Sequence, residues 1–372
     1  MKAVGILGAT GAVGREFIAA LENHPQFRVA RLFASERSTG KRLREATRLD
    51  ISSLPERVKD MVVEDVYAFG TEGLDLVCSA LPSDTAKEVE PGYARRLPVI
   101  STSAAFRYEA DVPVLITEVN AEHAPLLRQQ KARGWQGWVA PQPNCTTVGL
   151  AVSLKPILDA FGIQRVVMTS YQAVSGGGYE LIQRWQRERE GLAGKLPPPY
   201  EQFIERPETT LEGNVIGYID KEEPKVKAEA LKILGTFRNG VVEPVRFDID
   251  CFCARVPTLE GHLEAVFVET VKPCSPQDVM RAIAEFNARS QELYGSLPSS
   301  PRQAITVVDR VPQPRYDAEL DGGMTTVVGR IEKSDLGPRW IKFFALSNNV
   351  KKGAAKGSLQ VLEHLTSTGG YL

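Results

Sequence analysis

The sequence has almost no net charge and no long apolar run. Its 372 residues contain 45 Lys and Arg against 46 Asp and Glu, a formal net charge of −1. Nucleic acids and anionic membranes select basic surfaces, so neither partner is expected. No segment approaches the ~20 apolar residues of a membrane span, and "MKAVGILGATGAVG" breaks into glycines too early for a signal peptide. We therefore expect a cytoplasmic protein that acts on a small-molecule substrate.

Cysteine and histidine are also scarce, with five and four residues. An odd cysteine count in a long chain does not indicate a disulfide framework. Cys251 and Cys253 share one face of an expected strand, but a structural zinc site needs about four ligands and no second pair is present. We expect packing there and no metal site. His24, His123 and His364 are interpreted as surface residues.

The first half of the chain alternates strand-like with helix-like segments. The pattern runs through "AVGILGA", "AVGREFIAALENH", "FRVARLFAS", "LDLVCSA", "SDTAKEVEPGYARR", "LPVIST" and "VPVLITEVN". Such alternation predicts βαβ units and a mostly parallel sheet, the α/β class of fold.

After about residue 162, strand candidates dominate, which predicts an α+β domain with a mainly antiparallel sheet. A helix is expected in "SPQDVMRAIAEFNARSQELYG" and another in the tail "NNVKKGAAKGSLQVLEHL", while Pro197 to Pro199 indicate a loop. The strand candidates are "QRVVMTSYQ", "VRFDIDCFCARV", "HLEAVFVETV", "RQAITVVD", "MTTVVGRI" and "RWIKFFALS".

A glycine-rich turn links the first expected strand to the first helix. "GILGATGAVG" spaces Gly8, Gly11 and Gly14 as G-x-x-G-x-x-G. Glycines there permit a tight turn and close approach of a pyrophosphate to free helix N–H groups. A glycine motif alone can be a structural turn, but the strand before it and the helix after it favour a dinucleotide site.

The end of the second expected strand indicates which dinucleotide binds. NAD sites usually place Asp or Glu there for the ribose hydroxyls, whereas this chain has "ASERSTGKRL". Ser35, Arg37, Ser38 and Lys41 suit a 2′-phosphate, because Arg is a fork donor. Glu36 argues against it, and a solvated basic loop is the alternative. We favour NADP.

One cysteine, Cys145, stands where an apolar helical pattern begins, in "PNCTTVGLAVSL". A buried cysteine is usually inert, but a helix N-terminus lowers a thiol pKa and favours the reactive thiolate. Asn144 is a plausible N-cap. His262, seven residues after Arg255 in "RVPTLEGHLEAVFV", is a candidate acid or base, although a structural histidine is equally compatible with the pattern.

Taken together, these stretches resemble the aspartate-β-semialdehyde dehydrogenase family over nearly the whole chain. The resemblance rests on the order of "GATGAVG", "STSAAFR", "PNCTT", "SYQAVSGGGY", "EEPKVKAEALKIL", "RVPTLEGHLEAVFVE", "VVGRIEK" and "NNVKKGAAKGSLQ". It implies NADPH-dependent reduction of aspartyl-β-phosphate to the semialdehyde and phosphate. It also implies an NADP-binding Rossmann-type domain at 1–146, completed by a C-terminal helix at 349–372. A catalytic and dimerisation domain would occupy 147–348, in a homodimer or homotetramer.

The resemblance also implies a role for each site residue. Cys145 would form the acyl-enzyme, His262 would be the acid/base and Gln172 would orient the substrate. Arg255 would bind the α-carboxylate, Glu222 or Glu223 the amino group, and Arg107 with Lys225 the phosphate, with Asn144 in the same pocket. Ser175, Gly176, Gly177 and Asn349 would border the nicotinamide. The pyrophosphate and ribose would meet Gly8, Thr10, Gly11, Ala12, Val13, Gly14, Ser35, Arg37 and Ser38.

Some features depart from the usual family pattern. "SGGGY" replaces "SGAG", "STSAAFR" is longer than usual, and Pro224 interrupts the acidic motif; the later loop resembles the archaeal and fungal branch. A malonyl- or succinyl-CoA reductase on the same scaffold is one alternative, although its substrates carry no amine for Glu222. A silent NADP-binding homologue is another. N-acyl-glutamyl-phosphate reductases have Gly-Cys-Tyr-Pro in place of Asn-Cys-Thr-Thr.

Overall fold

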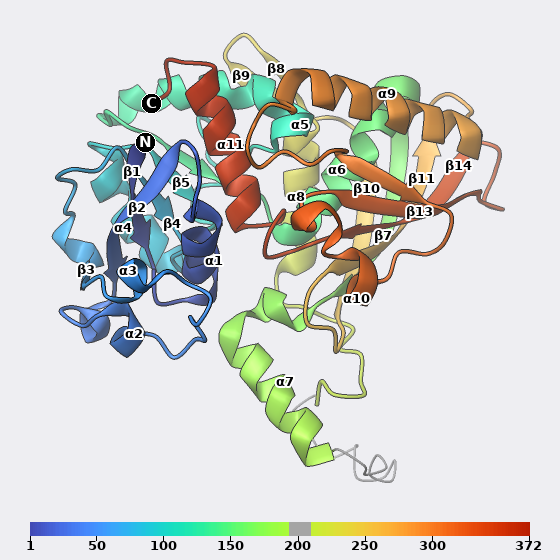
Figure 1. Ribbon diagram of the computed structural model, residues 1–372. Coiled ribbons are helices and arrows are strands. Elements are labelled where there is room, and N and C mark those ends of the chain that lie inside the picture. Colours follow the sequence, from blue (N-terminus) through green and yellow to red (C-terminus); the bar gives the residue numbers. More distant parts are fainter. Residues whose placement is uncertain (193–209) are drawn as a thin grey trace.

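Two six-stranded sheets with their helices make up most of the fold, and a small two-stranded sheet is formed by β8 (Thr236–Arg238) and β9 (Val241–Glu243) (Figure 1). The computed structural model describes residues 1–192 and 210–372, so the loop expected at Pro197 to Pro199 lies outside the described residues. Among the described residues, no helix is both long and apolar enough to cross a membrane. The predicted combination of a Rossmann-type domain with a second, α+β domain is confirmed.

The first sheet is parallel throughout, in the order β3-β2-β1-β4-β5-β6. Most of its strand residues are buried, as expected when helices cover both faces. The strands are β1 (Lys2–Leu7), β2 (Phe27–Ala34), β3 (Val63–Asp65), β4 (Leu76–Ser79), β5 (Val99–Ser101) and β6 (Val139–Pro141). The helical segments are α1 (Ala12–Leu21), η1 (Glu36–Ser38), α2 (Leu43–Ala46), α3 (Glu56–Lys59), η2 (Val66–Ala68), α4 (Ser83–Ala94), α5 (Thr117–Asn120) and η3 (Ala121–Arg133).

The sequence-based assignment fails at "VPVLITEVN", which does not join the sheet. Its side-chain hydrogen bonds explain this: Asn120 accepts from the Ile116 N–H at 2.8 Å and donates to the Val114 carbonyl at 2.9 Å. These bonds fold the segment back on itself and occupy backbone groups that a ladder would need. The sixth strand is instead β6, which the sequence pattern missed because it has only three residues.

The second sheet is mixed, in the order β10-β7-β11-β14-β13-β12. The three central pairings are antiparallel, whereas β10 with β7 and β12 with β13 are parallel. All six strand candidates from the second half of the sequence lie in this sheet. Their bounds are β7 (Ile163–Gln172), β10 (Asp248–Arg255), β11 (His262–Thr270), β12 (Ile305–Val308), β13 (Thr326–Lys333) and β14 (Trp340–Ser347).

Helices cover one face of this sheet and leave the other open. The core lies under α6 (Cys145–Phe161), with α8 (Glu222–Ile233) and α9 (Pro276–Tyr294) beside it. On the opposite face, Val167 and Phe252 are 49% and 69% exposed. The remaining segments are η4 (Val174–Gly177), α7 (Gly178–Leu192), α10 (Pro314–Asp317), η6 (Leu320–Gly323) and α11 (Ala355–Ser367).

The C-terminal helix α11 returns to the first domain and packs on α1, as its position beside that domain in Figure 1 shows. The segment before it is fixed by Lys352, a fully buried cation that pairs with buried Glu118 and donates to Gln360 at 3.0 Å. A buried charge needs such partners to offset its desolvation. The tail is thereby held in one place between the two domains.

The interpretation of His24 and His123 as surface residues is wrong, because both are buried. The His24 ring lies 2.9 Å from Glu363 of α11, and His123 contacts Asn120 and the Gly235 carbonyl at 3.1 and 3.2 Å. Each ring finds polar partners that are distant in sequence, so no local pattern identified its burial.

Candidate active site

The register of the strands brings three site residues together at one end of the second sheet's strands. The parallel strands β7 and β10 end together, with Gln172 paired to Arg255. The antiparallel strand β11 begins at the same end, because Leu263 pairs with Tyr171 and His262 precedes Leu263. All three side chains are buried. Residues far apart in sequence therefore meet at one end of the sheet.

The first turn of α6 places Cys145 at the same end of the strands. Asn144 caps the helix, its side-chain oxygen accepting the Thr146 and Thr147 N–H groups at 3.0 and 3.2 Å. The helix begins at Cys145, whose Sγ lies 3.3 Å from Nε2 of His262. The structure thus places a nucleophile and an imidazole in direct contact across 117 residues of sequence.

The orientation of His262 fixes which of its nitrogens carries the proton. The Ala173 N–H donates to Nδ1 at 3.1 Å, so the neutral ring carries its proton on Nε2, facing the sulfur. Burial, and next the Arg255 charge, lower the pKa of His262 to about 3. The ring is therefore neutral at pH 7. It suits hydrogen bonding to a thiolate and proton donation, rather than removal of the thiol proton.

The expectation of a low thiol pKa is wrong for the free protein. Burial, followed by the Glu222 carboxylate, raises the pKa of Cys145 to about 12, against the opposing effects of Arg255, Arg107 and the Thr146 N–H. The residue as a whole is of intermediate exposure. The helix terminus acts in the predicted direction, but desolvation outweighs it.

The structure distinguishes between the two adjacent glutamates at the start of α8. Buried Glu222 accepts from the Asn144 amide at 2.8 Å, and Lys225 lies 3.6 Å from its other oxygen. Glu223 instead accepts the Cys253 backbone N–H at 3.3 Å. Pro224 is accommodated because first-turn N–H groups have no partner within the helix. Only Glu222 therefore faces the cysteine.

A substitution at Glu222 tests the effect of its charge on the Cys145 pKa. Glu222→Gln removes the carboxylate that raises the Cys145 pKa, so the thiolate fraction at pH 8 should increase. Alkylation of Cys145 by iodoacetamide should become roughly tenfold faster, as expected for one nearby charge on a partly buried group. Glu223→Gln is the matched control, and its rate should equal that of the unmodified sequence. An unchanged rate in Glu222→Gln would show that this charge does not govern the thiol.

The predicted phosphate-binding arginine is held by a carboxylate that the sequence did not identify. Buried Arg107 donates from Nη1 to Glu229 at 3.1 Å, from Nε to the Gln142 carbonyl at 2.8 Å and from Nη2 to the Thr102 carbonyl at 3.1 Å. Glu229 reads in the sequence as an ordinary charge on an amphipathic helix. Its spacing of two turns from Glu222 was the available signal.

The η4 segment and the tail pack against the same cluster of residues. Gly176 lies against the Arg255 guanidinium and the His262 ring, with Gly177 next to it. Asn349 accepts the Gly261 N–H at 2.9 Å and donates to Ser175 at 2.8 Å. At Gly353 an added Cβ would meet the Cys145 Cβ at 3.0 Å, so only glycine lets the tail run this close.

The glycine loop has the geometry of an anion site. Gly14 packs so closely on the loop that an added Cβ would lie 2.3 Å from the Gly8 carbonyl oxygen. The helix α1 follows with Gly11 as its N-cap and no side-chain cap. The N–H groups of Ala12, Val13 and Gly14 therefore lack a capping side chain, and Thr10 completes the turn. These residues fit a dinucleotide pyrophosphate.

The expected 2′-phosphate residues follow β2 in the short helix η1. Ser35 and Arg37 are exposed and Ser38 is buried, while Lys41 donates to the Arg37 carbonyl at 2.9 Å. The loop lies beside the glycine turn, since Gly8 donates to the Phe33 carbonyl at 2.9 Å. Ser35 and Arg37 are therefore placed for the adenosine ribose side of a dinucleotide.

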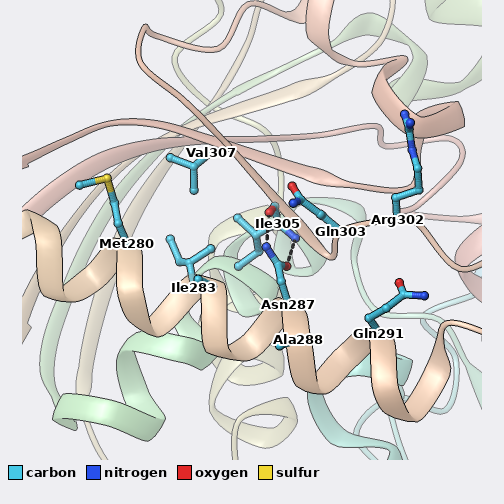
Figure 2. Close-up of a pocket in the computed structure, with 10 residues that line it drawn as sticks. Met280, Ile283, Asn287, Ala288, Gln291, Arg302, Gln303, Ile305 and Val307 are labelled. Carbon is cyan, nitrogen blue, oxygen red and sulfur yellow. Dashed lines mark hydrogen bonds between the residues drawn. The ribbon is translucent and has the colours of Figure 1, made fainter.

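A separate cavity of about 520 Å³ lies between α9 and β12 (Figure 2). Asn287 spans its base, donating to the Ile305 carbonyl at 2.7 Å and accepting from the Ile305 N–H at 2.9 Å. These bonds pair the free edge of β12 with a side chain. The cavity contains none of the predicted site residues; it is lined by Met280, Ile283, Ala284, Asn287, Ala288, Gln291, Arg302, Gln303, Ile305 and Val307.

Known proteins with the same architecture match both domains. Residues 3–126 match the model described as "Semialdehyde dehydrogenase, NAD binding domain", and residues 154–352 match "Semialdehyde dehydrogenase, dimerisation domain". An aspartate-semialdehyde dehydrogenase of Methanothermobacter thermautotrophicus is 38% identical over 96% of this chain and 97% of its own. A malonyl CoA reductase (NADP) of Metallosphaera sedula is 31% identical over 98% and 96%.

A solved structure supports the same family assignment. A crystal structure of aspartate semialdehyde dehydrogenase with NADP from Candida albicans superposes with a TM-score of 0.82, at 30% identity and 99% coverage of each chain. An archaeal and a fungal protein are thus among the relatives, which confirms the resemblance predicted from the motifs. The chain belongs to the semialdehyde dehydrogenase family of oxidoreductases.

Proposed function

We propose that the protein catalyses the NADPH-dependent conversion of L-4-aspartyl phosphate to L-aspartate 4-semialdehyde and phosphate through a thioester on Cys145. The Cys145–His262 contact, with a charged partner for each substrate group around it, carries this proposal. Arg255 complements the α-carboxylate and Glu222 the ammonium. Arg107 and Lys225 complement the phosphate, and Arg is suited to oxyanions because its fork binds two oxygens.

The chain's own residues account for the acyl-transfer half of the reaction. The Cys145 sulfur attacks the acyl carbon, a C–S bond forms, and phosphate leaves with the electrons of the C–O bond and takes up the thiol proton. The Cys145 N–H and the Gln172 amide are the proposed donors to the oxyanion, since the Thr146 and Thr147 N–H groups already donate to the Asn144 cap. A substrate ammonium on Glu222 offsets the charge that opposes the thiolate. His262, neutral with its proton on Nε2, hydrogen-bonds the oxyanion of the tetrahedral adduct that follows reduction, and this adduct collapses to the aldehyde as the C–S bond breaks and the Cys145 thiolate leaves.

NADP is the proposed cofactor, and when reduced it supplies hydride to the thioester carbon. Its pyrophosphate would lie on Gly8, Thr10, Gly11, Ala12, Val13 and Gly14, its 2′-phosphate near Ser35, Arg37 and Ser38, and its nicotinamide near Ser175, Gly176, Gly177 and Asn349. The uncapped α1 terminus supports the first placement, and the exposed Arg37 supports the second.

A CoA-thioester reductase is the competing function, because a malonyl CoA reductase is among the relatives. Glu222 favours the amino-acid substrate. Malonyl and succinyl groups present no ammonium, so the buried Glu222 carboxylate would then oppose the thiolate with only Lys225, 3.6 Å away, to offset its charge.

The other proposals concern the domain bounds, the oligomeric state and the location of the protein. We assign residues 1–146 together with α11 to the cofactor domain and residues 147–348 to the catalytic and dimerisation domain. A homodimer or homotetramer would cover the open sheet face, where Val167 and Phe252 are exposed. The proposed activity is that of a cytoplasmic biosynthetic enzyme.

One coupled assay tests the function. The purified chain should reduce NADP when given aspartate semialdehyde and inorganic phosphate or arsenate, and reduce NAD more slowly. Neither free CoA with the semialdehydes of malonate and succinate nor the corresponding CoA thioesters with NADPH should support turnover. Turnover with the CoA substrates alone would establish the competing function, and no turnover with any substrate, despite NADP binding, would establish a silent homologue.

A further inference from the structure

A buried carboxylate that makes no contact with Cys145 links the phosphate subsite to the nucleophile. Glu229 lies seven residues after Glu222 on α8, so both carboxylates point from one face of the helix. Glu222 accepts from the Asn144 side chain at 2.8 Å, and Glu229 accepts the Asn144 backbone N–H at 2.6 Å. The residue immediately before the nucleophile is therefore held at two points by one helix.

The same carboxylate holds Arg107. Its second oxygen accepts from Arg107 Nη1 at 3.1 Å, while Arg107 Nε donates to the Gln142 carbonyl at 2.8 Å. A closed ring results, running from Arg107 through Glu229 to the Asn144 N–H, then back along the chain to Gln142 and Arg107. The arginine is thus bound twice to the strand-to-helix turn that carries Cys145.

The ring still leaves Arg107 able to bind a ligand. A guanidinium has five N–H donors, and three of them are used by Glu229, Gln142 and Thr102. Within the described part of the chain, one N–H on each terminal nitrogen has no partner, which leaves two donors for a ligand; we call this pair the free fork. Both oxygens of Glu229 already have protein donors and the side chain is 1% exposed, so Glu229 itself is not placed to bind substrate.

We propose that Glu229 is the positioning residue of the phosphate subsite, holding the free fork of Arg107 in register with the Cys145 helix. The inference rests on the proposed function, since it requires phosphate to be a substrate or product. Loss of the Glu229 carboxylate should weaken recognition of phosphate. Recognition of the amino-acid groups of the substrate, which Arg255 and Glu222 provide, should stay largely intact.

Glu229→Gln tests this with little change of shape. A glutamine has one acceptor, so its amide nitrogen must face either the Asn144 N–H or the guanidinium. The variant is assayed in the direction that consumes semialdehyde and phosphate. KM for phosphate should rise roughly 10- to 100-fold, because one charge-assisted hydrogen bond is lost. KM for the semialdehyde should stay within about threefold of its value in the unmodified protein. Glu223→Gln, on the same helix, should leave both constants unchanged.

A second readout does not depend on turnover. Inorganic phosphate should protect Cys145 from iodoacetamide in the unmodified protein, and the phosphate concentration for half-protection should rise in Glu229→Gln by the same factor as KM. Glu229→Asp, which keeps the charge but withdraws it by one methylene, should show a smaller rise in both quantities and serves if the glutamine variant does not fold.

The outcomes separate the two claims. If the unmodified protein shows neither phosphate-dependent turnover nor protection, the proposed function fails and this inference fails with it. If the unmodified protein depends on phosphate and Glu229→Gln matches it, the function stands and Glu229 is not a positioning residue. A proportionate rise in both KM values would likewise contradict the inference, because it would indicate a general structural defect.

Discussion

Replacing Cys145 with serine should lower kcat for the phosphate-dependent reaction on the order of 10⁴- to 10⁶-fold, the range seen when a nucleophile is removed from a working site. A serine hydroxyl lies far from ionisation at neutral pH, and His262 faces it with an N–H rather than with an acceptor. The change is sterically small and leaves the Asn144 cap intact. Steady-state kinetics with aspartate semialdehyde, phosphate and NADP measure the effect.

Cofactor affinity provides the control for that variant. The glycine loop lies on α1 and makes no contact with Cys145 in the structure, so NADP binding measured by fluorescence titration should match the unmodified protein. The same change at Cys251, four residues before Arg255 on β10 and buried in the core of the second domain, is the thiol control and should retain turnover. Substantial turnover by the Cys145 variant would remove the thioester from the mechanism.

Arg255→Lys should also damage substrate use, although less severely than the loss of Cys145. The guanidinium is anchored by Nη1 to the Ala173 carbonyl at 2.7 Å and lies against Gly176. A lysine has its donors on a single nitrogen, so it cannot hold that anchor and also present a planar two-nitrogen fork to a carboxylate. The loss should be about 2–5 kcal/mol, or roughly 30- to 5,000-fold in kcat/KM, if the substrate carboxylate is left poorly paired.

The matching control is an arginine at the opposite end of the same sheet. Arg165 lies at the start of β7, exposed, and pairs with Asp248 and Glu269 at 3.6 and 3.5 Å. Arg165→Lys should leave kcat/KM within about twofold, because exposed pairs contribute little. Equal effects of the two substitutions would mean that Arg255 supports the sheet rather than the substrate.

The sequence predicted the second sheet well and the edges of the first sheet poorly. Six strands with clear apolar alternation all lie where expected, because a half-buried sheet face imposes a period of two. The short strand β6 and the folded-back "VPVLITEVN" were misjudged, since their structure depends on Asn120 and on neighbouring strands rather than on local pattern.

The site was predictable as a set of residues but not as a set of contacts. Order and spacing of motifs pointed to Cys145, Arg255 and His262, and the register of β7, β10 and β11 explains why they meet. The sequence could not weigh desolvation against the helix terminus at Cys145, nor separate Glu222 from Glu223. Glu229 was missed because a helix charge becomes buried only through its tertiary partners.

The most direct test of the account is the intact mass of the protein mixed with L-4-aspartyl phosphate in the absence of NADPH. The aspartyl group should be found on Cys145 as a hydroxylamine-sensitive adduct, with phosphate released and the adduct lost when NADPH is added. The Cys145→Ser variant should carry no such thioester. Turnover of the substrate with NADPH but no adduct on Cys145 at any time would contradict a covalent mechanism centred on this cysteine.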